Sequence, residues 1–111
     1  MLHKLRYLLN RNRCYCETEI NEQQLKKMID QGATLLDVRS PQEFEEGHLD
    51  NAILLPVYEI KEKAHSMLPN KLQVIIVYCS TGHRSQKAQK ILEKLGYEKV
   101  YNLCNGLENY D

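Results

Sequence analysis

No run of apolar residues in this sequence is long enough to form a transmembrane helix or the core of a secretory signal. Internal repeats, low-complexity tracts and linkers are also missing, so a second domain is not indicated. Four cysteines in 111 residues are too few for a disulfide-stabilised secreted scaffold, and they suit a reducing compartment. We therefore expect a soluble protein of the cytoplasm with no membrane span.

An excess of charge of either sign is lacking as well, since the formal net charge is zero, and we expect no nucleic-acid partner. The basic residues are unevenly distributed, because residues 1–13 hold four of the fifteen and no acidic residue. Leucines recur at helical spacing in this segment. We predict a basic N-terminal extension over residues 1–13, with a short helix lying against a single domain over residues 14–111. A membrane-surface or partner-docking helix is the alternative.

What the sequence does contain is a stretch, residues 74–85, around which the rest is organised. Residues 74–78 are apolar without alternation and mostly β-branched, as expected for a parallel strand buried on both faces. Cys79 and a short loop with Gly82 follow. Apolar residues then recur at helical spacing between 86 and 95. Cys79 is therefore expected between a central strand and the start of a helix.

The position of Cys79 has a chemical consequence. Backbone N–H groups at a helix start are unpaired and carry the positive end of the helix dipole, so they form a cradle for anions. These amides and the charge of Arg84 favour the thiolate over the thiol. Gly82 lets the backbone turn its amides inward, and Arg84 offers a planar fork to an oxyanion. We interpret Cys79 as a nucleophile; a small buried cysteine that ends a core strand is the alternative.

Strand and helix signals alternate along the rest of the chain. Helices are predicted after Asn21 and Ser40, each of which begins a capping-box pattern, and over residues 58–67. Strands are predicted over residues 17–20, 34–38, 52–55, 72–78 and 99–103. Such alternation is typical of an α/β fold with three layers, in which helices cover both faces of a five-stranded parallel sheet.

Several motifs, in order, resemble those of the rhodanese family of sulfurtransferases. The segment Cys79-Ser-Thr-Gly-His-Arg84 is similar to the six-residue active loop of that family. The other matching segments are Leu35-Leu-Asp37-Val-Arg39, Glu43-Phe44, Gly47-His48-Leu49, Ala52, Leu55-Pro56, Asn102-Leu103 and Gly106. The similarity covers about residues 17–111. The chain departs from the family in having Asn51 and Asn105 at usual glycine positions and Tyr110 where many members carry Trp and a longer tail.

The resemblance implies the strand order 3-2-4-5-1 and a reaction that needs no metal and no organic cofactor. Cys79 would attack the outer sulfur of a small anionic donor such as thiosulfate, hold it as a persulfide and pass it to a thiol or cyanide. Arg84 would bind the oxyanion of the donor. The other residues expected in the substrate-binding loop are Ser80, Thr81, Gly82, His83 and Ser85.

Two further residues are expected near Cys79, because the carboxyl ends of parallel strands share one edge of a sheet. Asp37 is expected to fix loop or strand ends through hydrogen bonds rather than to act in catalysis. Arg39 is expected to form a positioning ion pair with Glu43 or Glu46.

Cys104 is expected at the same edge. It is either a resolving thiol that attacks an oxidised or persulfidated Cys79, or a small residue that fills the turn before Gly106. Cys14-Tyr-Cys16 lacks the second pair of ligands that a structural zinc site needs, and we predict no metal.

A thiolate in an amide cradle beside an arginine also describes cysteine-dependent phosphatases and arsenate reductases. Those enzymes place the arginine six positions after the cysteine, whereas Arg84 comes five after Cys79 and Ser85 takes the sixth position. The shorter loop favours a cup that fits one sulfur atom. A sulfur-carrier module, whose donor or acceptor is another protein, stays open as a further alternative.

Overall fold

The computed structural model describes residues 18–110, so the predicted N-terminal extension, Cys14 and Cys16 lie outside the described residues. The strands are β1 (Glu19–Ile20), β2 (Thr34–Asp37), β3 (Ile53–Leu54), β4 (Ile75–Tyr78) and β5 (Val100–Leu103). The helices are α2 (Glu22–Asp30), α3 (Pro41–Glu46), α4 (Ile60–Met67) and α5 (His83–Lys94), with 3-10 turns η2 (Val57–Glu59) and η3 (Leu107–Asn109).

The five strands form one parallel sheet in the order β1-β5-β4-β2-β3. This is the predicted order read from the opposite edge, and it places β4 between β2 and β5. The α/β fold with a five-stranded parallel sheet is confirmed. Because β4 is central, the residue that follows it, Cys79, lies in the middle of the sheet edge.

Some strands are shorter than predicted, and β4 shows why. The prediction began this strand at residue 72, but Leu72 is exposed and the chain is still turning there. The amide of Leu72 donates to the side chain of Asn70, and the amide of Gln73 donates to the carbonyl of Asn70. A turn closed by an asparagine side chain competes locally with strand pairing, so the ladder starts only at Ile75.

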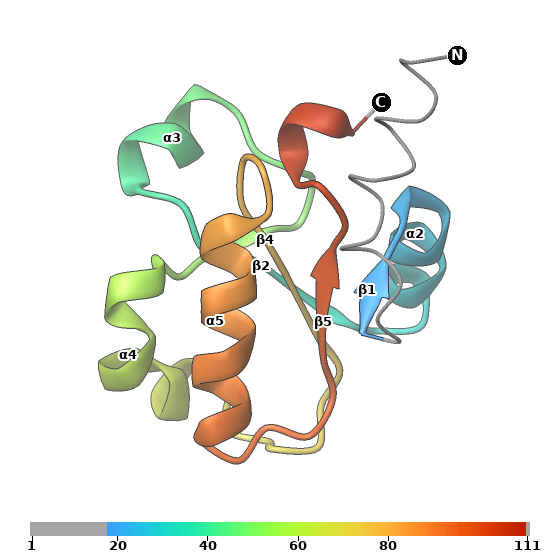
Figure 1. The fold of residues 1–111 in the computed structure, drawn as a ribbon. Helices are drawn as coiled ribbons and strands as arrows, with labels where there is room; N and C mark the ends of the chain where they lie inside the picture. Colours follow the sequence, from blue (N-terminus) through green and yellow to red (C-terminus); the bar gives the residue numbers. More distant parts are fainter. Residues whose placement is uncertain (1–17, 111) are drawn as a thin grey trace.

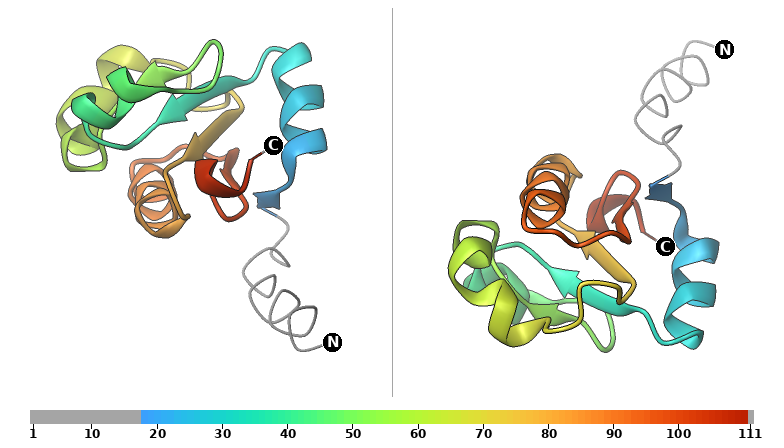
Figure 2. Two further views of the ribbon diagram at one scale, coloured as in Figure 1. Left: turned by 90° about the horizontal axis from the view of Figure 1, so that it is seen from above. Right: turned by 90° about the horizontal axis from the view of Figure 1, so that it is seen from below.

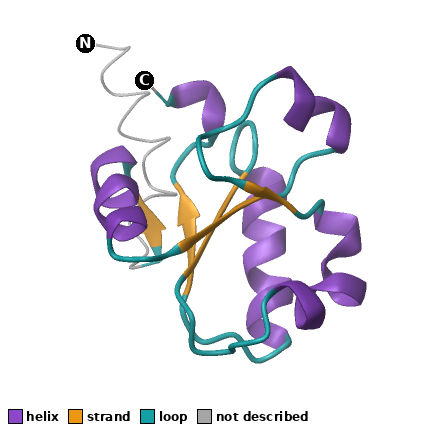
Figure 3. Ribbon diagram, turned by 180° about the vertical axis from the view of Figure 1, so that it is seen from behind, coloured by secondary structure: helices purple, strands orange, loops and turns teal. Residues whose placement is uncertain are grey.

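Helices lie on both faces of the sheet, as Figures 1 and 2 show, with α4 and α5 on one side and α2 on the other. Figure 3 gives the same arrangement from behind. Along β4, Ile75 and Val77 pack into the hydrophobic cluster under α4 and α5, whereas Ile76 and Tyr78 pack into the cluster under α2. Burial on both faces accounts for the lack of polar alternation in this strand.

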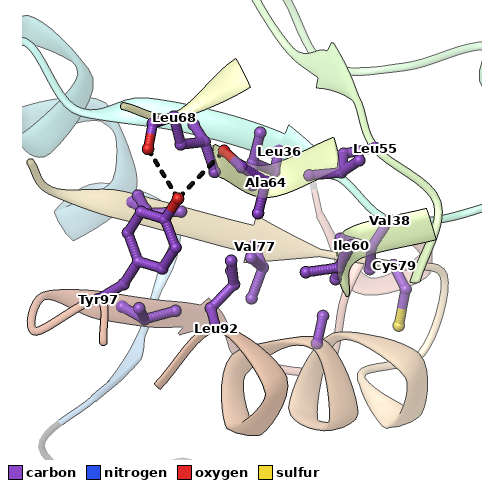
Figure 4. Close-up of a cluster of buried hydrophobic side chains, with 13 residues drawn as sticks. Leu36, Val38, Leu55, Ile60, Ala64, Leu68, Val77, Cys79, Leu92 and Tyr97 are labelled. Carbon is purple, nitrogen blue, oxygen red and sulfur yellow. Dashed lines mark hydrogen bonds between the residues drawn. The ribbon is translucent and has the colours of Figure 1, made fainter. Parts of the chain in front are cut away.

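The cluster under α4 and α5 links the core to Cys79. Figure 4 shows Tyr97 at one end of this cluster and Cys79 at the other. The Tyr97 hydroxyl donates to the carbonyls of Leu68 and Ala64, 2.7 and 3.0 Å away, at the end of α4. Both acceptors lie in or next to the last turn of α4, so these bonds tie Tyr97 to the end of that helix; the Ala64 carbonyl also accepts from the amide of Leu68. The thiol-bearing residue therefore belongs to the packed core and is only 1% exposed.

Both capping boxes form as predicted. The Asn21 side chain accepts from the amide of Gln24, and the Gln24 side chain accepts from the amide of Asn21. Ser40 and Glu43 make the same reciprocal pair at the start of α3. These bonds satisfy amides that the first turn of a helix leaves unpaired. Local sequence therefore determines where α2 and α3 begin.

Candidate active site

The residues singled out from the sequence meet at the carboxyl edge of the sheet. Figure 1 shows α3, the loop between β4 and α5, and the turn η3 gathered at this end of the molecule. The register pairs Asp37 with Tyr78, so Asp37 ends its strand directly beside the residue that precedes Cys79. β5 lies on the other side of β4 and is parallel to it, so the ends of β2, β4 and β5 lie side by side at this edge.

Backbone amides surround the sulfur of Cys79. The amides of Gly82 and Ser85 donate to Sγ at 3.0 and 3.3 Å. The buried hydroxyl of Ser85 lies 3.4 Å from Sγ, accepts the thiol hydrogen and itself donates to the carbonyl of Gly82. Donors aimed at one sulfur atom stabilise negative charge on it.

Gly82 makes this arrangement possible. Its φ of 103° lies in the left-handed region, and it is the N-cap of α5 without a side-chain cap. The amide of Gln86 donates to the carbonyl of Gly82, and the amides of the turn before it have no carbonyl of their own helix to bond. The chain can therefore direct the Gly82 and Ser85 amides at Cys79, as the pattern of residues 79–85 predicts.

The C-terminal turn holds the loop from the other side. The amide of Leu107 donates to the carbonyl of Cys79 at 2.8 Å, and that of Glu108 donates to the carbonyl of Ser80 at 2.9 Å. A Cβ on Gly106 would lie 2.6 Å from the carbonyl oxygen of Cys79, closer than any side chain is tolerated. The clamp was not predicted, and Gly106 was its signal in the sequence.

Asn105 precedes this clamp and has a φ of 62°, and Asn51 has a φ of 67°. Both therefore lie in the left-handed region that glycine usually occupies. Asn is the non-glycine residue that best tolerates this conformation. The two departures from the family's glycines thus leave both turns intact.

Arg84 reaches away from the loop to helix α3. Its NH1 and NH2 groups donate to Oε1 and Oε2 of Glu43 at 2.7 and 2.9 Å. The Ser80 hydroxyl joins them by donating to Oε2 of Glu43 at 3.3 Å. The pair raises the pKa of Arg84 and holds the pKa of Glu43 well below its usual range. Glu43 was not predicted to pair with Arg84, because nothing local in the sequence links residues some forty positions apart.

The predicted ion pair of Arg39 with Glu43 or Glu46 is wrong. Arg39 instead binds Asp37 through Nε and NH2, with the shortest contact 2.6 Å, and NH2 also donates to the carbonyl of Gly47. Residues two apart in an extended segment point to the same side, which brings Asp37 and Arg39 together. The hydrogen bonds that its guanidinium donates to Asp37 raise the pKa of Arg39.

Asp37 has the hydrogen-bonding role expected of it. It is fully buried and accepts from the amide of Arg39 and from the hydroxyl of Tyr78, 2.8 Å away. The Tyr78 oxygen in turn accepts from the amide of Leu49, and burial raises the pKa of this phenol. These bonds join β2, β4 and the segment after α3.

The remaining candidates fall into different environments. Thr81 is exposed on the loop, and His83 is exposed at the start of α5. His48 stacks on Phe44 and bonds its carbonyl at 2.7 Å, which is a structural contact.

Cys104 is disulfide-bonded, and Cys79 is free, so no bond joins them. A resolving role for Cys104 would require its disulfide to open first, and it stays a prediction.

Within residues 18–110, no group of three or more His, Cys, Asp or Glu side chains is placed to hold a metal ion. In the same part of the chain, none of the helices is long and apolar enough to cross a membrane. The chemistry described above belongs to one thiol, backbone amides, a hydroxyl and an arginine–carboxylate pair.

Known proteins share both the sequence pattern and the fold. The chain is 37% identical over 74 residues to the thiosulfate sulfurtransferase PspE of Escherichia coli. This alignment covers 67% of this chain and 70% of PspE. It is 30% identical to the putative sulfur carrier protein YrkF of Bacillus subtilis over 83% of the chain, and spans half of YrkF. The rhodanese-like domain of Alr3790 from Anabaena superposes with a TM-score of 0.75 at 29% identity, covering 83% of this chain and 71% of that one.

The human single-domain sulfurtransferase TSTD1 has the same fold, with a TM-score of 0.73 at 24% identity over 82% of this chain and 92% of TSTD1. Residues 21–111 match the family description of a rhodanese-like domain. This match spans most of the chain and includes the loop, the clamp and the strands that hold them. The chain belongs to the rhodanese-like family.

Proposed function

We propose that this protein is a sulfurtransferase that moves a sulfane sulfur from thiosulfate or another persulfide donor to a thiol or to cyanide through a persulfide on Cys79. The observation that carries this proposal is the pair of backbone amides directed at the sulfur of Cys79. Donors preorganised around one atom stabilise the charge of a thiolate and of a terminal persulfide sulfur. The PspE relative, named a thiosulfate sulfurtransferase, supports the same reaction type.

The reaction would proceed in two displacements. The Cys79 thiolate attacks the outer sulfur of thiosulfate, the sulfur–sulfur bond of the donor breaks, and sulfite leaves with the electron pair. A persulfide remains on Cys79. An acceptor thiolate or cyanide then attacks the terminal sulfur, and the Cys79 thiolate departs. Sulfur changes partners twice, and neither step requires a metal or an organic cofactor.

The loop residues would have different roles in these two steps. Amides of residues 80–85 hold the terminal sulfur, and the Ser85 hydroxyl can turn from the carbonyl of Gly82 to the sulfur once the thiol hydrogen has left. Arg84 binds the oxyanion of the donor and stabilises the departing sulfite. Exposed Thr81 and His83 contribute at the rim, where donor and acceptor enter.

A phosphatase or arsenate reductase is disfavoured by the sixth position after Cys79. That position holds Ser85, which is fully buried and bonded to Sγ, so no arginine completes a cup for a tetrahedral anion there. A sulfur-carrier role on protein partners has more support, since YrkF is named a putative sulfur carrier.

The decisive experiment compares Cys79→Ser with Cys14→Ser and Cys16→Ser in thiocyanate formation from thiosulfate and cyanide. We expect Cys79→Ser to lose all but a trace of activity, because the sulfur that the two amides surround is removed, and the two control variants to keep it. Activity retained by Cys79→Ser would refute the assignment. A wild-type protein that is inert toward thiosulfate but is persulfidated by a cysteine desulfurase would instead favour the carrier role.

A further inference from the structure

We propose that Glu43 is a specificity-determining residue that disfavours oxyanion donors. Its carboxylate occupies Arg84, the group that would otherwise receive the oxyanion of thiosulfate. The donors that fit the site best would then be persulfides whose reacting end carries no oxyanion. This inference rests on the proposed sulfurtransferase function and names its donor class.

The contacts of Arg84 carry the first step. Both of its terminal nitrogens bond Glu43, one to each carboxylate oxygen, in the fork geometry that a bound oxyanion would use. NH2 also lies 3.5 Å from the Ser80 hydroxyl. An incoming oxyanion must therefore replace the Glu43 carboxylate or share the guanidinium with it.

Glu43 is held in place rather than paired by chance. Its Oε1 accepts from the amide and the hydroxyl of Ser40, each at 3.1 Å, and its Oε2 accepts from the hydroxyl of Ser80. The bond from the Ser40 amide belongs to the capping box of α3, the Ser40 hydroxyl adds a second bond from the same residue, and the third comes from the loop after β4. The carboxylate is thus prepositioned in front of Arg84, and no reorganisation is needed to form the pair.

The pair is separable, which makes it a selector rather than a permanent block. The side chains of Arg84 and Glu43 are 40% and 30% exposed, and partly exposed ion pairs open at small cost. A doubly charged donor meets a pair with no net charge, so it gains little attraction on approach and must then compete with Glu43. A persulfide R–S–SH needs no such exchange: Cys79 attacks its terminal sulfur, the S–S bond breaks, and R–S⁻ leaves.

The test compares alkylation of Cys79 by iodoacetate, which is an anion, and by iodoacetamide, which is neutral, with the Cys79 adduct quantified by peptide mass spectrometry. The ratio of the two rates cancels changes in access to the thiol. We expect Glu43→Gln to raise the iodoacetate-to-iodoacetamide ratio about five- to ten-fold, the scale of one charge-assisted hydrogen bond at a partly exposed site. Gln keeps an oxygen for the Ser40 amide and matches Glu in size.

Two variants serve as controls. Glu45→Gln removes an exposed carboxylate from the same helix, and we expect the ratio to stay within about two-fold of the wild type. The double variant Glu43→Gln/Arg84→Gln again has a neutral pair, so its ratio should return to the wild-type value. An unchanged ratio in Glu43→Gln, or an equal rise in Glu45→Gln, would overturn the proposal.

A measurement on the wild type protects the test against a variant that does not fold. If Glu43 neutralises Arg84, the ratio depends little on salt, whereas an unoccupied arginine gives a ratio that falls steeply as salt rises from about 0.05 to 0.5 M. The steep fall would count against the proposal. These alkylation measurements require no sulfur transfer, so they test the role of Glu43 even if the proposed function is wrong.

Kinetics complete the experiment. With thiosulfate, Glu43→Gln should have a lower KM, with the change in KM rather than in kcat. With an alkyl persulfide, whose reacting end carries no oxyanion, KM should not change. A loss of activity with both donors would mean that Glu43 acts only as a structural cap, and the specificity role would be rejected. A protein in which no donor sulfurates Cys79 would refute the proposed function separately.

Discussion

Two arginines of this molecule make nearly the same contact in very different surroundings. Arg39 binds Asp37 and Arg84 binds Glu43, each with two nitrogens on the two oxygens of a carboxylate. The side chains of the first pair are 7% and 0% exposed, whereas both members of the second are substantially exposed. The first pair lies at the ends of the strands, and the second crosses from α3 to the loop that holds Cys79.

The difference shows that the same type of ion pair can have a structural role in one place and a role in ligand selection in another. Removing one partner of a sealed ion pair leaves a buried charge without compensation, which is strongly destabilising. An exposed pair adds little stability and exchanges partners readily. Asp37 therefore organises the strand ends, and Glu43 is placed to compete with ligands of Arg84.

The largest expected effect separates the two pairs by stability. Arg39→Ala should lower the free energy of unfolding by roughly 3 to 5 kcal/mol, because it leaves the buried Asp37 carboxylate without its cationic partner. Arg84→Ala, the same change at the exposed pair, should lower it by less than about 1 kcal/mol. Urea unfolding at neutral pH measures both. Similar losses for the two variants would erase the distinction.

The next effect is on activity, where the change at Arg84 is expected to be large although its effect on stability is small. Arg84→Ala should lower kcat/KM for thiosulfate about ten- to hundred-fold, since a bidentate contact to the oxyanion is lost and Glu43 is left as an uncompensated negative charge. Arg84→Lys keeps the charge but not the fork, so it should recover only part of the activity. Steady-state thiocyanate formation measures this, and wild-type activity in Arg84→Ala would remove Arg84 from the site.

The smallest effect is a pH dependence of the exposed pair. Hydrogen bonds from Arg84 hold the pKa of Glu43 below its usual 4.5. A carboxyl group whose pKa is lowered by folding contributes stability that is complete above the unfolded pKa and is lost as the pH falls through the folded pKa. The difference in unfolding free energy between wild type and Glu43→Gln should therefore be constant down to about pH 5 and shrink at lower pH.

Urea titrations at several pH values, with Glu45→Gln as the control, measure this difference. Partial exposure of both side chains limits it to under about 1 kcal/mol. A difference that grows as the pH falls would contradict the assigned direction of the Glu43 shift.

Much of the fold could be predicted because its signals are local. The capping patterns at Asn21 and Ser40 place two helix starts, and the unbroken apolar run before Cys79 indicates a strand buried on both faces. The strand order came from the family resemblance. Strand ends were less accurate, because the hydrogen bond that the Leu72 amide donates to the Asn70 side chain delays the start of β4, and no periodicity of apolar residues reports such a bond.

The sequence by itself determined the α/β architecture and the amide cradle, since a strand, a glycine and a helix start are consecutive and their geometry follows from backbone rules. Only the tertiary structure decided the partners of the charged groups. Glu43 reads locally as a capping residue and Arg84 as a free cation, yet they meet because α3 and the loop after β4 lie at one edge of the sheet. Ion pairs depend on distances through space. Two residues some forty positions apart in the chain produce no periodic sequence pattern that reports such a distance.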